Sequence, residues 1–354
     1  MPSLFEPLQL GPYELANRVI MAPLTRSRAG AARIPNAMMA EYYRQRASAG
    51  LIISEATAVT PMGVGYAETP GIWSDEQVAG WKLVTDAVHR EGGRIFVQLW
   101  HVGRISHPMF LDGALPVAPS AVTPAGFVSI VRPLQSFVTP RALELDEIAQ
   151  IIEAYRIGAQ NALRAGFDGV ELHGANGYLP DQFLQDGTNR RTDQYGGAIE
   201  NRARFMLEAL DALISVWGAD RVGLHLSPNG QVHDIRDSDP VATFGYVARE
   251  AGKRGIAFIC AREAKSDGWL APLLKREFGG LYIVNEGFGK QEAEAALAAG
   301  EADAVAFGKS YIANPDLPAR LKADAQLNPQ QTETFYKGGP GGYIDYPRLQ
   351  PTAA

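Results

Sequence analysis

His173, Asn176 and Tyr178 lie within one short segment and form a set that could act on a carbonyl or nitro compound. His173 and Asn176 offer two neutral hydrogen-bond donors, and Tyr178 offers a weak acid two residues later. Such donors can hold the oxygen of the compound while the phenol delivers a proton. The set predicts reduction of an activated double bond, provided that another group supplies a hydride.

The loop that carries these residues follows a segment typical of a buried strand. Eight such segments occur along the chain, and they are apolar throughout rather than alternating. Parallel strands that are covered on both faces have this pattern. The segments span residues 18–24, 51–58, 94–100, 169–173, 222–227, 257–262, 281–285 and 304–308.

Amphipathic segments lie between most of these strands. They predict helices over residues 77–90, 145–165, 200–216, 243–253, 291–299 and 315–325. Repeated strand–helix units imply right-handed crossovers and a parallel sheet. Eight units in a chain of 354 residues predict an α/β fold, a (β/α)8 TIM barrel that forms one domain over residues 1–354.

Two segments fall outside this repeat. Residues 107–139, after the third strand, are rich in Pro, Val and Ser, and we expect an excursion there, a small hairpin or lid over the barrel mouth. Residues 326–354 are expected to form an irregular C-terminal tail. A doubly wound Rossmann sheet is the alternative fold, but no Gly-x-Gly-x-x-Gly follows the first strand.

Composition argues against several classes of function. The net charge of −6 and the absence of Lys/Arg runs disfavour nucleic-acid and membrane-surface partners. No apolar run approaches the roughly 18 residues that span a bilayer. Residues 1–6 lack the features of a signal peptide, so we expect a cytoplasmic enzyme. Cys260, the single cysteine, lies in an apolar run and is expected to be a buried, inert thiol.

In a barrel of this kind the active site lies at the C-terminal ends of the strands. Each polar residue there is weak support for a site when taken alone, but together they define the candidate region. They are Thr25, Glu55, Gln98, His101, His173, His225, Arg262, Asn285 and Lys309.

Longer motifs run collinearly from the first strand to the last. They include Met21-Ala22-Pro23-Leu24-Thr25-Arg26, Gln98-Leu99-Trp100-His101-Val102-Gly103-Arg104, His173-Gly174-Ala175-Asn176-Gly177-Tyr178 and Ala306-Phe307-Gly308-Lys309. The series resembles the Old Yellow Enzyme family of flavin-dependent ene-reductases over nearly the whole chain. It is most similar to the bacterial branch that includes morphinone, pentaerythritol tetranitrate and N-ethylmaleimide reductases.

The resemblance implies a noncovalently bound FMN. The residues implied to contact the ring are Ala22, Pro23, Leu24, Thr25, Ala56 and Gln98. Thr25 would donate to flavin O4, and Gln98 would both donate to and accept from the pyrimidine edge. The simpler interpretations are a strand-end turn for Thr25 and a satisfied barrel amide for Gln98.

The resemblance also implies a phosphate site at the ends of the seventh and eighth strands, formed by Gly287, Gly308 and Lys309. The family usually has Arg where this chain has Lys309, and Lys binds phosphate as a point charge. An ordinary surface lysine is the alternative. The family usually has Arg at the position of His225 as well, and a histidine there carries a conditional charge.

On the substrate side, the resemblance implies that His173 and Asn176 bind the acceptor oxygen and that Tyr178 donates the proton to Cα. Tyr66, Trp100 and Tyr336 match aromatic positions of the family pocket, although aromatic residues are often simple core. The implied reaction is ping-pong: NADPH or NADH reduces the flavin, which then reduces an electron-poor alkene, a nitro compound or a nitrate ester.

Two other classes of function remain as alternatives. A metal-dependent barrel hydrolase needs bound zinc, but no group of three ligands is evident near Glu55 or His101, and no metal is expected. A non-catalytic flavin-binding protein would be yellow without reducing an enone. The charged run over residues 191–202 is assigned to structure, with Asp193 and Glu200 expected to pair with nearby arginines.

Overall fold

Eight parallel strand positions close into a barrel in the computed structural model, which describes residues 2–336 and 338–350. The second position is split into two short strands, and pairing of its first piece with both neighbours closes the ring. The predicted (β/α)8 barrel and its eight strands are therefore confirmed. The strands are β3 (Val19–Met21), β4 (Ile52–Ile53), β5 (Thr57–Ala58), β6 (Ile95–Trp100), β9 (Gly169–His173), β10 (Val222–Leu226), β11 (Phe258–Arg262), β12 (Leu281–Asn285) and β13 (Ala304–Phe307).

The lower part of the barrel interior is filled by apolar side chains such as Phe96 and Phe258. An antiparallel hairpin of β1 (Leu8–Leu10) and β2 (Tyr13–Leu15) packs against this core. The Tyr13 hydroxyl donates to the carbonyl of Asp168, just before β9, at 3.0 Å. The hairpin thus covers the N-terminal end of the barrel, and the opposite end is left for a site.

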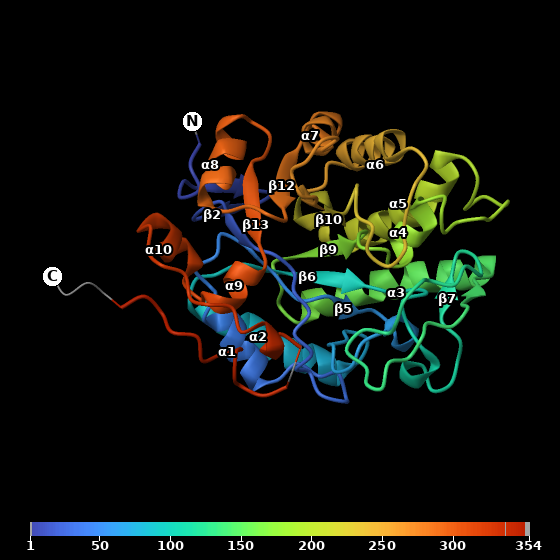
Figure 1. Ribbon diagram of the computed structural model, residues 1–354, viewed down its shortest axis with the longest axis horizontal. Helices are drawn as coiled ribbons and strands as arrows, with labels where there is room; N and C mark the ends of the chain where they lie inside the picture. Colours follow the sequence, from blue (N-terminus) through green and yellow to red (C-terminus); the bar gives the residue numbers. More distant parts are fainter. Residues whose placement is uncertain (1, 337, 351–354) are drawn as a thin grey trace.

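Helices surround the strands, with α1 and α2 on one side and α6 and α7 on the other in Figure 1. The six predicted helices are present, although the last is shorter than residues 315–325 and covers only Leu317–Lys322. Four helices of five to eight residues were not predicted: α1, α4, α7 and α9. A side-chain cap at Ser74 with Gln77 starts the second helix. The helices are α1 (Ala37–Arg44), α2 (Asp75–Arg90), α3 (Leu145–Arg164), α4 (Leu179–Leu184), α5 (Ile199–Trp217), α6 (Pro240–Arg254), α7 (Ala271–Phe278), α8 (Lys290–Ala298), α9 (Lys309–Ala313) and α10 (Leu317–Lys322).

The segment between β6 and α3 lies at the end of the barrel toward which the β6 arrow points (Figure 1). It contains the short parallel pair β7 (Val117–Ala118) and β8 (Arg141–Ala142) and one antiparallel bridge between Phe127 and Ser136. Its role as a lid stays a prediction. None of the helices within residues 2–336 and 338–350 combines the length and apolar character needed to cross a bilayer.

The C-terminal segment is held against the barrel by buried arginines. Arg26 donates from Nε to the carbonyl of Phe335 at 3.0 Å and from Nη2 to that of Gly342 at 2.9 Å. Its guanidinium also lies 4.9 Å from the centre of the Tyr343 ring. These contacts place Tyr336 at the mouth of the barrel. The last part of the predicted tail, residues 351–354, lies outside the described residues.

Candidate active site

A cavity of about 590 Å³ opens at the C-terminal end of the barrel. Its wall contains residues from the ends of β3, β6, β9, β10, β11, β12 and β13, so the strand ends meet as expected. Most of the predicted site residues line it: Ala22, Pro23, Leu24, Thr25, Gln98, His173, Asn176, His225, Gly287, Gly308, Lys309 and Tyr336.

Four other predicted site residues form an apolar group directly beside this cavity: Ala56, Tyr66, Trp100 and Tyr178. The Trp100 ring is nearly parallel to that of His173, with centroids 6.3 Å apart. The Tyr178 ring meets His173 edge-on at 4.9 Å. His173 therefore stands between the cavity and this aromatic group.

Two polar strand-end residues from the sequence, Glu55 and His101, are not part of the cavity wall. Both are buried in the surrounding structure. Glu55 accepts hydrogen bonds from the Arg26 backbone N–H at 3.2 Å and the Tyr43 hydroxyl at 3.4 Å. Burial lowers the pKa of His101 to about 3, so this ring is neutral. Their roles are structural.

The loop after β9 is pinned so that His173 and Asn176 face the same cavity. The Asn176 backbone N–H donates to Ser227 Oγ at 2.7 Å, and the Gly177 N–H donates to Asp181 Oδ2 at 2.9 Å. Asn176 and Gly177 have φ values of 59° and 75°. These left-handed conformations suit asparagine and glycine better than most residues, because both tolerate this region.

Burial keeps His173 neutral, since it lowers the pKa of this histidine well below its ordinary value. The nearby His225, His233 and Arg262 act in the same direction. The Nδ1 atom of His173 has no hydrogen-bond partner among the described residues. A neutral imidazole carries one N–H, so His173 can donate one hydrogen bond to a neutral or anionic ligand atom.

The orientation of the Asn176 side chain is set by Arg262, at the end of β11. Arg262 Nη1 donates to Asn176 Oδ1 at 2.9 Å, and Arg262 Nη2 pairs with Glu286 Oε1 at 2.9 Å. Because the amide oxygen is occupied, the NH₂ group of Asn176 is the part left for a ligand. His173 and Asn176 thus both act as donors.

Tyr178 lies at the start of α4 and is protonated at neutral pH. Burial raises the pKa of Tyr178 well above the ordinary value of a tyrosine, and the neighbouring Tyr66 adds to the effect. The two hydroxyl oxygens are 2.8 Å apart. A phenol of this kind can donate a proton to a strongly basic carbon but does not ionise on its own.

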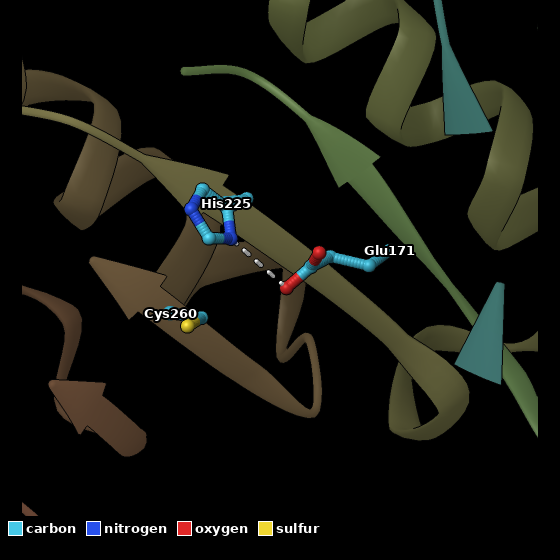
Figure 2. A group of neighbouring side chains, drawn as sticks. All are labelled: Glu171, His225 and Cys260. Carbon is cyan, nitrogen blue, oxygen red and sulfur yellow. Dashed lines mark ion pairs between the residues drawn. The ribbon is translucent and has the colours of Figure 1, made fainter. Parts of the chain in front are cut away.

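Glu171, His225 and Cys260 form a buried group (Figure 2), and His225 of this group also lines the cavity. Their possible ligand atoms lie within 4.8 Å of one another, and His225 Nδ1 is 3.5 Å from Glu171 Oε1. The other carboxylate oxygen accepts from Gln98 Nε2 at 2.7 Å. The sequence did not reveal this group, because its members come from the neighbouring strands β9, β10 and β11.

Glu171 therefore orients one residue of the cavity wall, Gln98, and lies close to a second, His225. Because Gln98 Nε2 donates to this carboxylate, Gln98 Oε1 is left to accept a hydrogen bond from another group. Cys260 is buried as expected, and burial raises the pKa of its thiol well above its ordinary value; that the thiol is inert stays a prediction. A protonated thiol is a poor metal ligand.

Other cavity residues were not assigned from the sequence. Glu286, Phe288 and Ser310 line the wall beside predicted residues, and Arg262 was recognised only as a strand-end residue. In the run over residues 191–202, Arg191 pairs with Asp193 at 2.5 Å as expected. Glu200 forms no ion pair with an arginine among the described residues, so its expected pairing was wrong; Arg202 of the same run instead pairs with the buried side chain of Asp237 at 2.6 Å.

Comparison with known proteins identifies a matching family. Residues 3–328 match the model of the NADH:flavin oxidoreductase / NADH oxidase family. The chain is 44% identical to a probable flavin mononucleotide-dependent alkene reductase of Leishmania infantum, over 97% of both chains. It is 43% identical to 12-oxophytodienoate reductase 1 of Oryza sativa subsp. japonica, over 98% of this chain and 93% of that one.

Solved structures agree with this match. Morphinone reductase in complex with tetrahydroNAD superposes with a TM-score of 0.95 at 51% identity, over 99% of each chain. The old yellow enzyme homologue from Zymomonas mobilis superposes with a TM-score of 0.96 at 45% identity, over 98% of this chain and all of that one.

Proposed function

This chain belongs to the NADH:flavin oxidoreductase / NADH oxidase family and is an oxidoreductase of the Old Yellow Enzyme type, and on that premise we propose that it is an FMN-dependent ene-reductase. It takes electrons from NADH or NADPH and reduces C=C bonds activated by a carbonyl or nitro group. The single observation that carries this proposal is the pair of neutral donors, His173 and Asn176, which face one cavity beside the phenol of Tyr178.

The residues present fit FMN. The cavity is large enough for a flat tricyclic ring, and its wall combines apolar faces with polar strand ends. His225 lines the cavity and Glu171 lies beside it, and the buried atoms His225 Nδ1 and Glu171 Oε1 have no hydrogen-bond partner by ordinary geometry among the described residues. A ligand with a polar edge could supply the missing hydrogen-bond partners of these buried atoms. Bound FMN supplies the reversible acceptance and donation of a hydride, which no amino-acid side chain provides.

We assign the ring contacts to Ala22, Pro23, Leu24, Thr25, Ala56, Gln98 and His225. Gly287, Gly308 and Lys309 would hold the phosphate. Gly287 has a φ of 81°, which brings backbone rather than side chain to the cavity. Lys309 supplies a cation, and phosphate binding at the last two strand ends is common in barrels of this kind.

His173 and Asn176 bind the oxygen of the acceptor and stabilise the negative charge that develops on it during reduction. Both donors are held in place before the ligand arrives, His173 by burial and Asn176 by Arg262. Preorganised donors of this kind do not have to reorient during the reaction. Tyr178 delivers the proton to the carbon next to the activating group. Tyr66, Trp100 and Tyr336 form the walls for a flat substrate.

The proposal is tested with the purified protein. Its absorption spectrum should show bound flavin, and heating should release a compound that chromatographs as FMN. Anaerobic NADH or NADPH should bleach the flavin, and 2-cyclohexenone should restore its colour faster than buffer alone. A protein that stays colourless after addition of FMN would contradict the proposal. Flavin that is bound but not reoxidised by any enone or nitroalkene would indicate the non-catalytic alternative.

A further inference from the structure

A chain of hydrogen bonds runs away from the cavity behind Tyr178. The Tyr178 and Tyr66 hydroxyl oxygens are 2.8 Å apart. The Tyr66 hydroxyl lies 3.3 Å from His233 Nε2, and His233 Nδ1 lies 2.7 Å from the backbone carbonyl oxygen of Asn176. His233 belongs to the loop after β10 and is a partly exposed residue, and the next residue, Asp234, is exposed. The chain therefore connects the phenol at the cavity with the protein surface.

The carbonyl of Asn176 determines which nitrogen of His233 carries a proton. A carbonyl oxygen can only accept, so Nδ1 must donate. In neutral His233, Nε2 is then an acceptor and takes the single proton of Tyr66. The bond between the phenols must in that case be donated by Tyr178, whose proton points away from the cavity.

Protonation of His233 reverses the whole chain. Nε2 of the imidazolium donates to the Tyr66 oxygen, and Tyr66 donates to the Tyr178 oxygen. The Tyr178 proton is then free to point into the cavity. The state of a histidine near the surface thus determines whether the phenol faces the substrate.

We propose that Tyr66 and His233 form a proton relay that directs and replenishes the proton of Tyr178. This inference rests on the proposed role of Tyr178 as proton donor. In the step, the Tyr178 O–H bond breaks as a C–H bond forms on the substrate. Tyr66 passes its proton to Tyr178, and His233 passes its Nε2 proton to Tyr66. His233 is left neutral and takes a new proton from water, so that one proton crosses the chain per turnover.

The surroundings of His233 set the pH at which the relay works. Burial lowers the pKa of His233 below its ordinary value, the bond to the Asn176 carbonyl opposes this shift, and Arg104 and Arg262 lower the pKa further. Burial raises the pKa of Tyr66 to about 12, and hydrogen bonds from Tyr178 and Ser129 oppose this rise. The titratable or charged groups around His233 are Tyr66, Arg104, His173, Tyr178 and Arg262.

The sign of the pH effect follows from these shifts. At neutral pH most His233 is neutral, and the chain points away from the substrate. As pH falls toward the lowered pKa of His233, the reversed chain becomes populated. Proton delivery to the substrate should therefore become faster on acidification, whereas flavin reduction by NADH requires no proton from Tyr178.

The test separates hydride delivery from proton delivery. A nitroalkene with a substituent on the carbon that is protonated is mixed with the reduced enzyme without oxygen. Its nitronate is stable enough to leave unprotonated, and later protonation in water gives a racemic centre. Rapid quenching between pH 5.5 and 8.5 should show a protonated, stereochemically defined product that increases as pH falls.

His233→Gln retains hydrogen-bonding groups but cannot titrate, and Tyr66→Phe breaks the chain in its middle. Each variant should abolish the pH dependence of proton delivery and slow this delivery on the order of tenfold. This loss is smaller than the roughly 10²-fold or more that removal of the general acid itself should cause. The double variant should deliver protons no more slowly than either single variant, because Tyr66 and His233 act in one chain. His107→Gln, a partly exposed histidine in the excursion, is the control and should behave as the wild type.

Reduction of the bound flavin by NADH reports folding in each variant. A wild-type pH profile and wild-type product stereochemistry in His233→Gln, beside a defective Tyr178→Phe, would overturn the relay alone. Normal proton delivery in Tyr178→Phe would overturn the proposed donor and the relay with it.

Discussion

At the scale of single residues, the site combines groups whose ordinary behaviour is changed by burial. His173 is held neutral and Tyr178 is held protonated, because burial disfavours the charged form of each. The first can donate to a developing negative charge, and the second can give up a proton only to a strong base. This division of roles needs no metal ion or charged acid at the reacting carbon.

The substrate-oxygen pair can be tested directly. Replacing both His173 and Asn176 by Ala should leave flavin bound but lower kcat/KM for an enone, because the developing charge loses its donors. Losing one such donor typically costs about 2.7–4 kcal/mol of transition-state stabilisation. Steady-state kinetics with 2-cyclohexenone on flavin-loaded protein measure the loss. Unchanged kcat/KM in this double variant would rule out the assignment.

At this scale the sequence predicted residue types better than residue orientations. It identified His173 and Asn176 at the end of one apolar strand, and Gln98 as a polar residue near the end of another. It did not identify His233, which depends on a loop conformation with a φ of 64°. It also did not predict that Arg262 would bind the Asn176 amide oxygen, since this contact joins the ends of two strands that are not neighbours in sequence.

At the scale of elements, the strand ends are tied together across the mouth of the barrel. Arg262 at the end of β11 joins Asn176, beyond β9, to Glu286, beyond β12. The eight strands were predictable because strands covered on both faces are apolar throughout. The helices α1, α4, α7 and α9 were harder to predict, because a segment of five to eight residues gives few turns from which to recognise a helical period.

Arg262→Met should free the Asn176 amide and allow it to rotate. We expect weaker enone binding and slower enone reduction, with an effect of about 1.5–3 kcal/mol, as for loss of a hydrogen bond to a charged group. In an Asn176→Ala background the same change should have little further effect, because Arg262 acts through Asn176. Stopped-flow kinetics of the four proteins give this coupling.

The matched control is Arg249→Met, which removes an arginine paired with Glu277 on the outer helices at 2.9 Å. It should leave enone reduction unchanged. Strictly additive effects of Arg262→Met and Asn176→Ala would show that Arg262 does not position the amide.

At the scale of the whole molecule, buried carboxyl groups make stability depend on pH. Burial raises the pKa of Glu55 to about 7 and that of Asp181 to about 7. An unfolded glutamate titrates at about 4.3. Between these values the folded chain keeps a proton that the unfolded chain has lost, so the free energy of unfolding falls as pH rises from about 4.3 to about 7.

Glu55→Gln should flatten part of this dependence. Each unit of pKa displacement corresponds to about 1.4 kcal/mol of unfolding free energy. Between pH 4.5 and 8 the free energy of unfolding should therefore fall on the order of 3 kcal/mol less in Glu55→Gln than in the wild type. Urea unfolding at saturating flavin, followed across this range, measures the difference. The exposed Glu14→Gln serves as the control. Parallel profiles for wild type and Glu55→Gln would contradict the shift assigned to this carboxyl group.

We infer that the cavity holds a hydride carrier while the chain itself supplies the proton through Tyr178. Stopped-flow measurement of the two half-reactions in Tyr178→Phe separates these two roles. NADH should reduce the bound flavin at the wild-type rate, because this step needs no proton from the phenol. Reoxidation by 2-cyclohexenone should be slowed by roughly 10²-fold or more, the usual contribution of a general acid. An equal loss in both half-reactions, or none in either, would contradict the role of Tyr178 as the proton donor.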